Sequence, residues 1–175
     1  MNEITTDNDK QLFDYLVELL SKEVTLYRQL LEMLRNKQEA IVIGDVKTLR
    51  KCVVEEQLLI QKIKSLAKIR SEHVVTISWT YKLAEKEPKL KTIMEIAPAE
   101  FSISFINLRY QLKTIIDEIT NINRENSYLL NFSIEHIKGL AHLFLRTDNE
   151  SSEIYDVNGI VITPEDGNKV LNFQI

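Results

Sequence analysis

The chain contains few of the residues that end or cross-link regular structure. Its 175 residues include only 4 glycines, 3 prolines and a single cysteine, Cys52. One cysteine excludes an internal disulfide and most cysteine-based metal sites, so Cys52 is interpreted as a small hydrophobic residue on a helix face. Because glycine and proline mark most turns, their scarcity, together with 27% charged residues, predicts long helices.

Segments that would direct the chain to a membrane are also missing. The first residues, MNEITTDNDK, are acidic and polar, without the basic start and apolar run of a signal peptide. No later window approaches the roughly 18 consecutive apolar residues of a membrane-spanning helix. We therefore expect a cytoplasmic protein that does not insert into a membrane.

An excess of positive charge is absent as well. Residues 1–75 hold 12 basic and 12 acidic side chains, and residues 76–146 hold 9 and 8. Without a basic stripe, nucleic acid is not an expected partner. Residues 147–175 hold 1 basic and 6 acidic side chains, so the net charge of −4 belongs to this tail.

Motifs for catalysis or metal binding are not found. There is no glycine-rich phosphate loop, no G-x-S-x-G and no HExxH. His136 and His142 fall on different helix faces, and no Glu is followed three residues later by His. The segment EHIKG resembles the His-x-x-Lys-Gly motif of phosphotransfer domains, but Lys138 lies only two residues after His136. We predict no enzyme, cofactor or metal, with histidine phosphotransfer as the least favoured alternative.

Apolar residues recur every three or four positions along most of the chain, which is typical of helices. The predicted long helices cover about 8–43, 46–84 and 99–146, and a connector helix covers about 88–97. In the first helix the stripe contains Leu16, Leu20, Val24, Tyr27, Leu31, Leu34, Gln38 and Ile41. In the second it contains Leu49, Val53, Glu56, Ile60, Ile63, Ala67, Arg70, Val74 and Ile77.

The expected fold class is all-α, an antiparallel bundle of three long helices over residues 1–146. Gly44 and Asp45 leave a short connection, so the first two helices should form a hairpin. Residues 74–82 alternate like a strand, but helix is favoured because the preceding pattern continues through them. The acidic tail, residues 147–175, should be irregular or weakly β, and a weak hairpin within it is left open.

Two asparagines, Asn123 and Asn126, interrupt the stripe of the third long helix. The expected stripe is Phe101, Phe105, Leu108, Leu112, Ile115, Ile119, Asn123, Asn126, Leu130, Ile134, Ile137, Ala141 and Phe144. Two pairs of successive four-residue steps flank the asparagines and predict local unwinding there. The structural interpretation is a polar layer that fixes helix register at some cost in stability.

Four features, in this order, resemble the FlgN family of flagellar export chaperones. They are the first helix ending in EAIVIGDVKTLRKCVVEEQLLIQKI, the segment LRYQLKTIIDEITNINRENSYLL, the apolar run IEHIKGLAHLF, and a tail beginning IYDVNG. The combination of Asn-x-x-Asn-x-x-x-Leu with Tyr-x-x-x-Gly is more specific than each piece. The middle segment SWTYKLAEKEPKLKTIMEIAP departs from the family pattern.

The resemblance implies a cytosolic chaperone without ATPase activity. Its clients would be the two hook-filament junction proteins, which are hook-associated proteins, and it would prevent their aggregation and deliver them to the export gate. The asparagines would then mark where the packed bundle gives way to a segment that can open for a client.

An apolar stripe late in the third helix can hold an amphipathic client helix. The candidate client-binding residues are Leu130, Ile134, Ile137, Leu140, Ala141 and Phe144. Alternatively, the same residues close the bundle against the first helix. By resemblance, Tyr155 and Gly159 dock to the cytoplasmic domain of the export gate, although the Tyr155 ring could instead fold back onto the bundle. The runner-up function is a scaffolding bundle whose stripe pairs with its own copy, and a weak homo-oligomer is left open.

Overall fold

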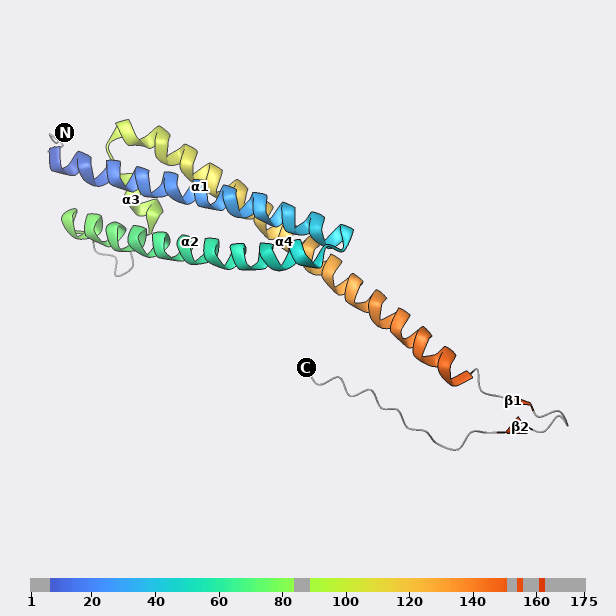
Figure 1. Cartoon of the computed structure of the whole chain (residues 1–175). Coiled ribbons are helices and arrows are strands. Elements are labelled where there is room, and N and C mark those ends of the chain that lie inside the picture. Colours follow the sequence, from blue (N-terminus) through green and yellow to red (C-terminus); the bar gives the residue numbers. More distant parts are fainter. Residues whose placement is uncertain (1–6, 84–88, 151–153, 156–160, 163–175) are drawn as a thin grey trace. The chain divides into compact units, whose positions relative to one another are not determined.

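The structure is a computed structural model that describes the backbone of residues 7–83, 89–150, 154–155 and 161–162, and side chains over 10–83 and 89–145. Its elements are α1 (Asp7–Ile43), α2 (Val46–Thr80), α3 (Leu90–Ile96), α4 (Ala99–Glu150), β1 (Ile154–Tyr155) and β2 (Val161–Ile162) (Figure 1). The predicted all-α class is confirmed. In the tail, β1 and β2 form a two-residue antiparallel pair, in which Ile154 pairs with Ile162 and Tyr155 with Val161.

Two helix ends differ from the prediction. Helix α2 continues through Thr80, so helix rather than strand is confirmed for residues 74–80, but it does not reach residue 84. The chain leaves the helix at Lys82, whose φ of 52° lies in the left-handed region. Helix α4 is longer than expected and ends at Glu150 rather than at residue 146.

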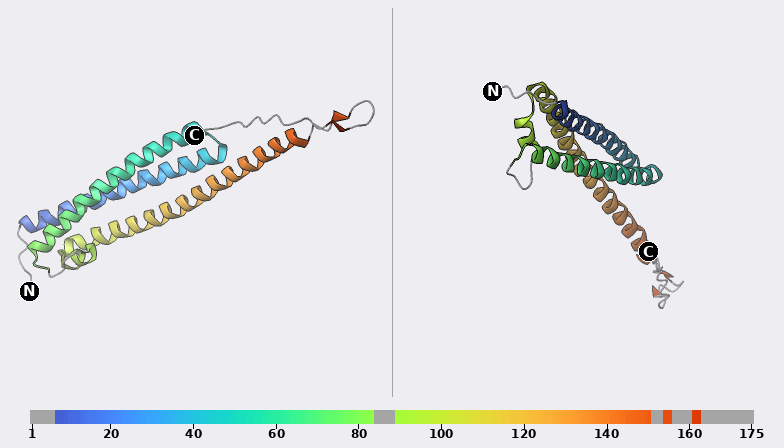
Figure 2. Two further views of the ribbon diagram at one scale, coloured as in Figure 1. Left: turned by 90° about the horizontal axis from the view of Figure 1, so that it is seen from below. Right: turned by 90° about the vertical axis from the view of Figure 1, so that its left-hand side faces the viewer.

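The turn between α1 and α2 is built by two adjacent residues. Gly44 adopts a φ of +73°, and the N–H groups of Gly44 and Asp45 donate to the Ile41 and Ala40 carbonyls at 3.2 and 2.9 Å, which ends α1. Asp45 then begins α2, because its carboxylate accepts from the Thr48 backbone N–H at 3.0 Å and from the Thr48 hydroxyl at 2.6 Å. The helices therefore fold back on each other and lie side by side (Figures 1 and 2).

Helix α4 packs on this hairpin in the same direction as α1. Four side-chain contacts follow the same order along both helices: Lys10 with Glu100, Arg28 with Gln111, Arg35 with Glu118, and Gln38 with Glu125. Because α2 runs opposite to α1, it also runs opposite to α4.

The core consists of two clusters along the bundle. The first joins all four helices and contains Phe13, Leu16, Leu20, Val74, Ile77, Ile93, Phe101 and Phe105. The second, nearer the turn, contains Val24, Leu30, Leu31, Met33, Leu34, Cys52, Ile63, Ile115 and Ile122. The predicted stripes of α1 and α2 are buried or half-buried, except for Val53, whose neighbour Cys52 is buried instead.

Polar residues in the predicted α2 stripe pair with α1. Arg70 Nε donates to Glu23 Oε1 at 2.8 Å, and the Glu23 side chain is only 4% exposed. Lys37 Nζ donates to Glu56 Oε2 at 2.7 Å in a partly buried pair. Each pair joins one helical turn of α1 to one helical turn of α2, so together the pairs fix the register of the two helices.

Of the two asparagines predicted on the stripe of α4, Asn126 is confirmed there and the prediction for Asn123 is wrong. Helix α4 is uninterrupted from Ala99 to Glu150, and Asn123 is exposed, whereas Ile122 and Asn126 are buried. The buried and half-buried positions step regularly by four and three: Phe101, Phe105, Leu108, Leu112, Ile115, Ile119, Ile122 and Asn126. Ile122 is buried in place of Asn123, because the apolar side chain gains more from burial. The first pair of successive four-residue steps is thereby replaced by a step of four followed by a step of three.

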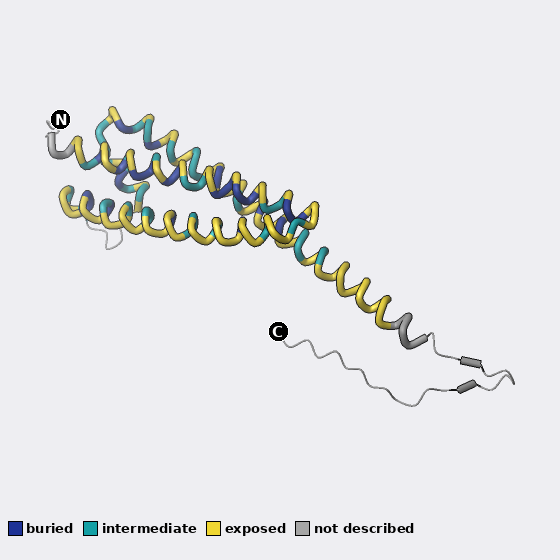
Figure 3. The backbone as a smooth tube through the Cα atoms, viewed as in Figure 1, coloured by how far each residue is buried: buried dark blue, intermediate teal, exposed yellow. Residues whose placement is uncertain are grey.

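The described contacts divide the chain into two units, Met1–Leu129 and Leu130–Ile175. Among the α4 side chains that the structure describes, Asn126 is the last buried one, and none from Ser127 to Leu145 is buried (Figure 3). The predicted functional division into residues 1–146 and 147–175 stays a prediction.

Candidate functional site

The second unit begins with an exposed apolar stretch of α4. Of the six predicted client-binding residues, Leu130 is half-buried and the other five are exposed. The exposed fractions are 48% for Ile134, 65% for Ile137, 43% for Leu140 and 72% for Phe144. In the described chain these side chains do not form a closed core.

Most of these residues share one helix face. At about 100° per residue, Leu130, Ile134, Ile137, Ala141 and Phe144 fall within roughly 80° of one another around the axis, and Leu140 lies at the edge of this arc. We call these six residues the apolar stripe. The α-helical backbone of α4 thus brings the predicted residues together without any loop.

The sequence interpretation missed apolar residues on other faces of the same stretch. Phe132 and Leu143 lie on the side opposite the apolar stripe and are 62% and 66% exposed, and Leu145 is exposed as well. A helix that is hydrophobic on all sides is normally buried in a larger structure. That composition was the available signal, because it is visible in the run FSIEHIKGLAHLFL.

Polar side chains on this stretch contact one another or a ring. Lys138 Nζ donates to Glu135 Oε1 at 2.9 Å, and the His136 ring stacks on Phe132 with 6.5 Å between ring centroids. The structure therefore does not bring His136 and Lys138 together as phosphotransfer would need. A shallow depression of about 490 Å³ lies beside Glu135, Ala141 and His142, on a surface that offers mainly apolar contact area.

The predicted gate-docking residues lie mostly outside the described part of the chain. The backbone of Tyr155 pairs with Val161 in the β1–β2 pair, while its side chain and Gly159 are not described. Their assignment stays a prediction.

The described residues offer neither a metal site nor a membrane span. Within them, no three or more His, Cys, Asp or Glu side chains form a group that could hold a metal ion. No helix in this part of the chain is long and apolar enough to cross a bilayer.

Comparison with known proteins shows a family match. No curated protein and no solved structure matches the chain significantly. A family described as FlgN protein matches residues 1–160. This range includes α1 to α4, the apolar stripe and the Tyr-x-x-x-Gly segment. The predicted resemblance is therefore confirmed, and the chain belongs to the FlgN family.

Proposed function

We propose that this protein is a cytoplasmic flagellar export chaperone. It binds hook-associated proteins of the hook-filament junction, keeps them from aggregating and delivers them to the export gate. Membership of the FlgN family supports a flagellar chaperone role. The observation that carries the proposal is the exposed apolar stripe of α4, because soluble helices rarely leave such a surface without a partner.

The chemistry of the stripe suits an amphipathic helix of the client. Isoleucine and leucine side chains supply contact area without directional demands, so they accept related sequences from more than one client. Complete burial of such a side chain contributes about 1.5–3 kcal/mol, and Ile137 is 65% exposed before binding. Several such residues together offset the entropic cost of association.

Replacement of Ile137 by Asp tests this site. The variant should retain its helix content and lose roughly 30-fold or more in client affinity, since an apolar contact is replaced by a charge that needs water. The measurement is titration calorimetry with a purified hook-associated protein, together with circular dichroism.

The matched control is Ile106→Asp. Ile106 is 62% exposed on the same helix but lies in the first unit, outside the apolar stripe. The Ile106→Asp variant should bind client with the affinity of the wild type. Unfolding of the Ile137 variant would instead place this residue in a core, and equal loss of binding in both variants would remove the assignment.

We also propose that residues 1–146 form the client-binding body and that residues 147–175 carry the contact with the export gate. A tyrosine offers large contact area at low entropic cost, which makes Tyr155 a suitable anchor. Tyr155→Ala should leave client affinity unchanged and weaken binding of the loaded chaperone to the cytoplasmic domain of the gate.

Tyr110→Ala serves as the control for this second step, because Tyr110 is 71% exposed on α4 in the first unit. Both activities should be measured by biolayer interferometry with immobilised client and immobilised gate domain. Loss of both activities in the Tyr155 variant, or of neither, would contradict a role in gate docking alone.

A further inference from the structure

The second unit of α4 carries a further row of side chains at helical spacing. Phe132, His136, Gly139 and Leu143 follow one another in steps of four, three and four. At about 100° per residue, they fall within roughly 60° of one another around the helix axis. We call these four residues the second seam. Its centre lies about 150° from that of the apolar stripe, so the two rows are on nearly opposite sides of α4.

The second seam is exposed and has the spacing of a helix-packing surface. Phe132 is 62% and Leu143 is 66% exposed. The His136 ring lies parallel to the Phe132 ring, with 6.5 Å between their centroids and 6° between their planes. Alternating steps of three and four are those of a coiled-coil seam, whose side chains pack against a facing helix. The apolar stripe alternates in the same way from Leu130 to Phe144, so each row suits one partner helix.

Gly139 indicates that a partner approaches the second seam closely. A glycine in the interior of a helix is destabilising relative to alanine. Apart from the adjoining residues and helix backbone, no described atom lies within 4 Å of the position that a Cβ atom at Gly139 would take. The glycine therefore makes no room for another described part of the chain. A partner helix gives it a use, because a large side chain of that helix can pack into the space above Gly139.

Polar residues mark the part of α4 that stays in water. Asn131, Glu135, Lys138 and His142 lie between the two rows on one side of the helix, within about 60° of one another. Lys138 Nζ donates to Glu135 Oε1 at 2.9 Å, and both side chains remain largely exposed. On the other side, Leu140 lies between the apolar stripe and the second seam. The apolar surface thus extends from one row to the other.

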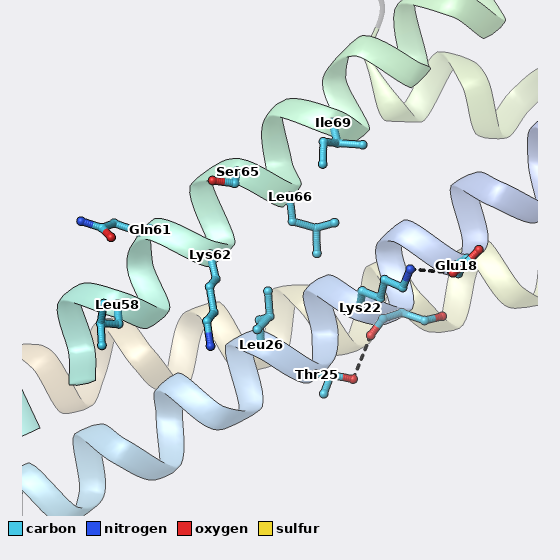
Figure 4. Close-up of a pocket in the computed structure, with 11 residues that line it drawn as sticks. Glu18, Lys22, Thr25, Leu26, Leu58, Gln61, Lys62, Ser65, Leu66 and Ile69 are labelled. Carbon is cyan, nitrogen blue, oxygen red and sulfur yellow. Dashed lines mark hydrogen bonds and ion pairs between the residues drawn. The ribbon is translucent and has the colours of Figure 1, made fainter. Parts of the chain in front are cut away.

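The shape of this surface limits what can cover it. Between α1 and α2, a groove of about 790 Å³ has two walls, and Leu26 and Leu66 point toward each other across it (Figure 4). In general, a groove with two helical walls accepts a single helix. In the second unit, α4 is the only helix that the structure describes, so it offers no such walls. A partner must therefore pack on each side of α4 separately.

The area of one row is small for a specific contact. Between Leu130 and Leu145, α4 is about 23 Å long, and with a diameter of about 11 Å its side surface is roughly 800 Å². One partner helix covers an arc of about 100°, which is roughly 220 Å² of this surface. Counting both molecules, one row buries roughly 450 Å², whereas a specific interface buries about 1,000 Å² or more. Two helices, one on each row, bring the contact close to that size.

We infer that the client holds α4 with two helices, one on the apolar stripe and the other on the second seam. The inference rests on the proposed function, because it extends the client site from one side of α4 to the other. Through its own α4, a second copy of the chain would cover one row and leave the other uncovered. A client with both helices on one chain covers the two rows in a single complex.

Gly139→Ala tests the second seam against the effect of helix stability. Alanine favours the helix, but its methyl group fills the space into which the partner side chain packs. The variant should gain helix content by circular dichroism and lose at least 10-fold in affinity for a purified hook-associated protein by titration calorimetry. Asn131→Ala is the matched control, because it also favours the helix but lies among the polar residues, and it should bind like the wild type. Unchanged or tighter binding by Gly139→Ala overturns the inference.

Cross-linking identifies what lies on each row. In a Cys52→Ala background, Phe132→Cys and Ile137→Cys variants are labelled separately with a thiol-reactive benzophenone, mixed with a hook-associated protein and irradiated. Mass spectrometry should find two different segments of the client, one attached at each position. The same client segment at both positions, or an adduct between two copies of the chaperone in the Phe132→Cys sample, overturns the inference.

Charge substitutions separate this inference from the proposed function. Phe132→Asp should weaken client binding about as much as Ile137→Asp, and Ile106→Asp is the control for both. If only Ile137→Asp loses binding, the client lies on the apolar stripe alone, so the inference falls and the proposed function stands. If both variants bind like the wild type, the assignment of the client site to this part of α4 falls as well.

Discussion

Helix α4 places the same kinds of residues in two very different environments. Phe105, in the part packed on the hairpin, is 1% exposed, whereas Phe132, further along the same helix, is 62% exposed. Both parts show apolar residues at helical spacing. The comparison shows that periodicity identifies side chains able to pack, while the neighbouring helices decide which of them do.

The difference follows from the length of the covering helices. Gln38 of α1 still contacts Glu125, but α1 ends soon afterwards at Ile43, and α4 continues to Glu150. Asn126, which donates to the Leu34 carbonyl, is accordingly the last buried residue in the described part of α4.

The largest contrast is expected from the same substitution in the two parts. Phe105→Ala removes a fully buried ring and should lower the free energy of unfolding by about 3–5 kcal/mol. Phe132→Ala removes an exposed ring and should change it by no more than about 0.5 kcal/mol. Urea denaturation followed by circular dichroism measures both values. Similar losses would mean that Phe132 is covered in solution.

A moderate effect is expected at the border between the two parts. Asn126 Nδ2 donates to the Leu34 carbonyl at 3.0 Å, but Asn126 Oδ1 is buried and accepts no hydrogen bond from the described residues. Asn126→Leu removes this unsatisfied acceptor, at the loss of one hydrogen bond, and should stabilise the fold by about 1 kcal/mol.

Thermal unfolding by circular dichroism detects this change as a higher melting temperature. Asn123→Leu is the control, because Asn123 is exposed and its substitution should have little effect. An unchanged or lower value for Asn126→Leu would show that the oxygen is satisfied, and a role of the amide in fixing register at a cost would be excluded.

The smallest effect is expected at the Gly44–Asp45 turn between α1 and α2. The Thr48 hydroxyl, and secondly the Thr48 backbone N–H, lower the pKa of the Asp45 carboxyl below its ordinary value of 3.8. A lowered pKa in the folded state means that the ionised cap stabilises the fold above the ordinary pKa and that this contribution is lost as the pH falls through the folded value.

Asp45→Ala should therefore lower the melting temperature slightly at neutral pH, and the difference from the wild type should shrink in acid. Asp117→Ala, which removes an exposed carboxylate within α4, is the control for the loss of a surface charge. A difference that persists at low pH would assign the stabilisation to the turn backbone rather than to the ionised carboxyl.

Much of the bundle could be predicted from the sequence because its signals are local. The spacing of leucines in α1 and the Gly44–Asp45 pair predicted the hairpin, since a glycine with positive φ and a capping aspartate act within a few residues. The partners of Glu56 and Arg70 were not predictable, because Lys37 and Glu23 lie on another helix and are selected by packing. The position of Asn123 was misjudged because steps of three and four are both helical, and only the covering helices select between them.

The exposure of the candidate site was likewise not fixed by its sequence. Ile137 has the same helical spacing as the buried Ile122, and the resemblance to the FlgN family supplied the functional interpretation. Whether an apolar residue of α4 is covered depends on the lengths of the neighbouring helices, which are encoded elsewhere in the chain.

Cys52 has a consequence for measuring motion in this molecule. It is the only thiol in the chain, is 5% exposed and lies in the core cluster nearest the turn. A buried thiol reacts with an aqueous disulfide reagent only while the surrounding structure is open, so its labelling rate reports the fraction of time spent open. The labelling rate of Cys52 in the native chain therefore measures the opening of the hairpin, with and without client, and needs no engineered cysteine.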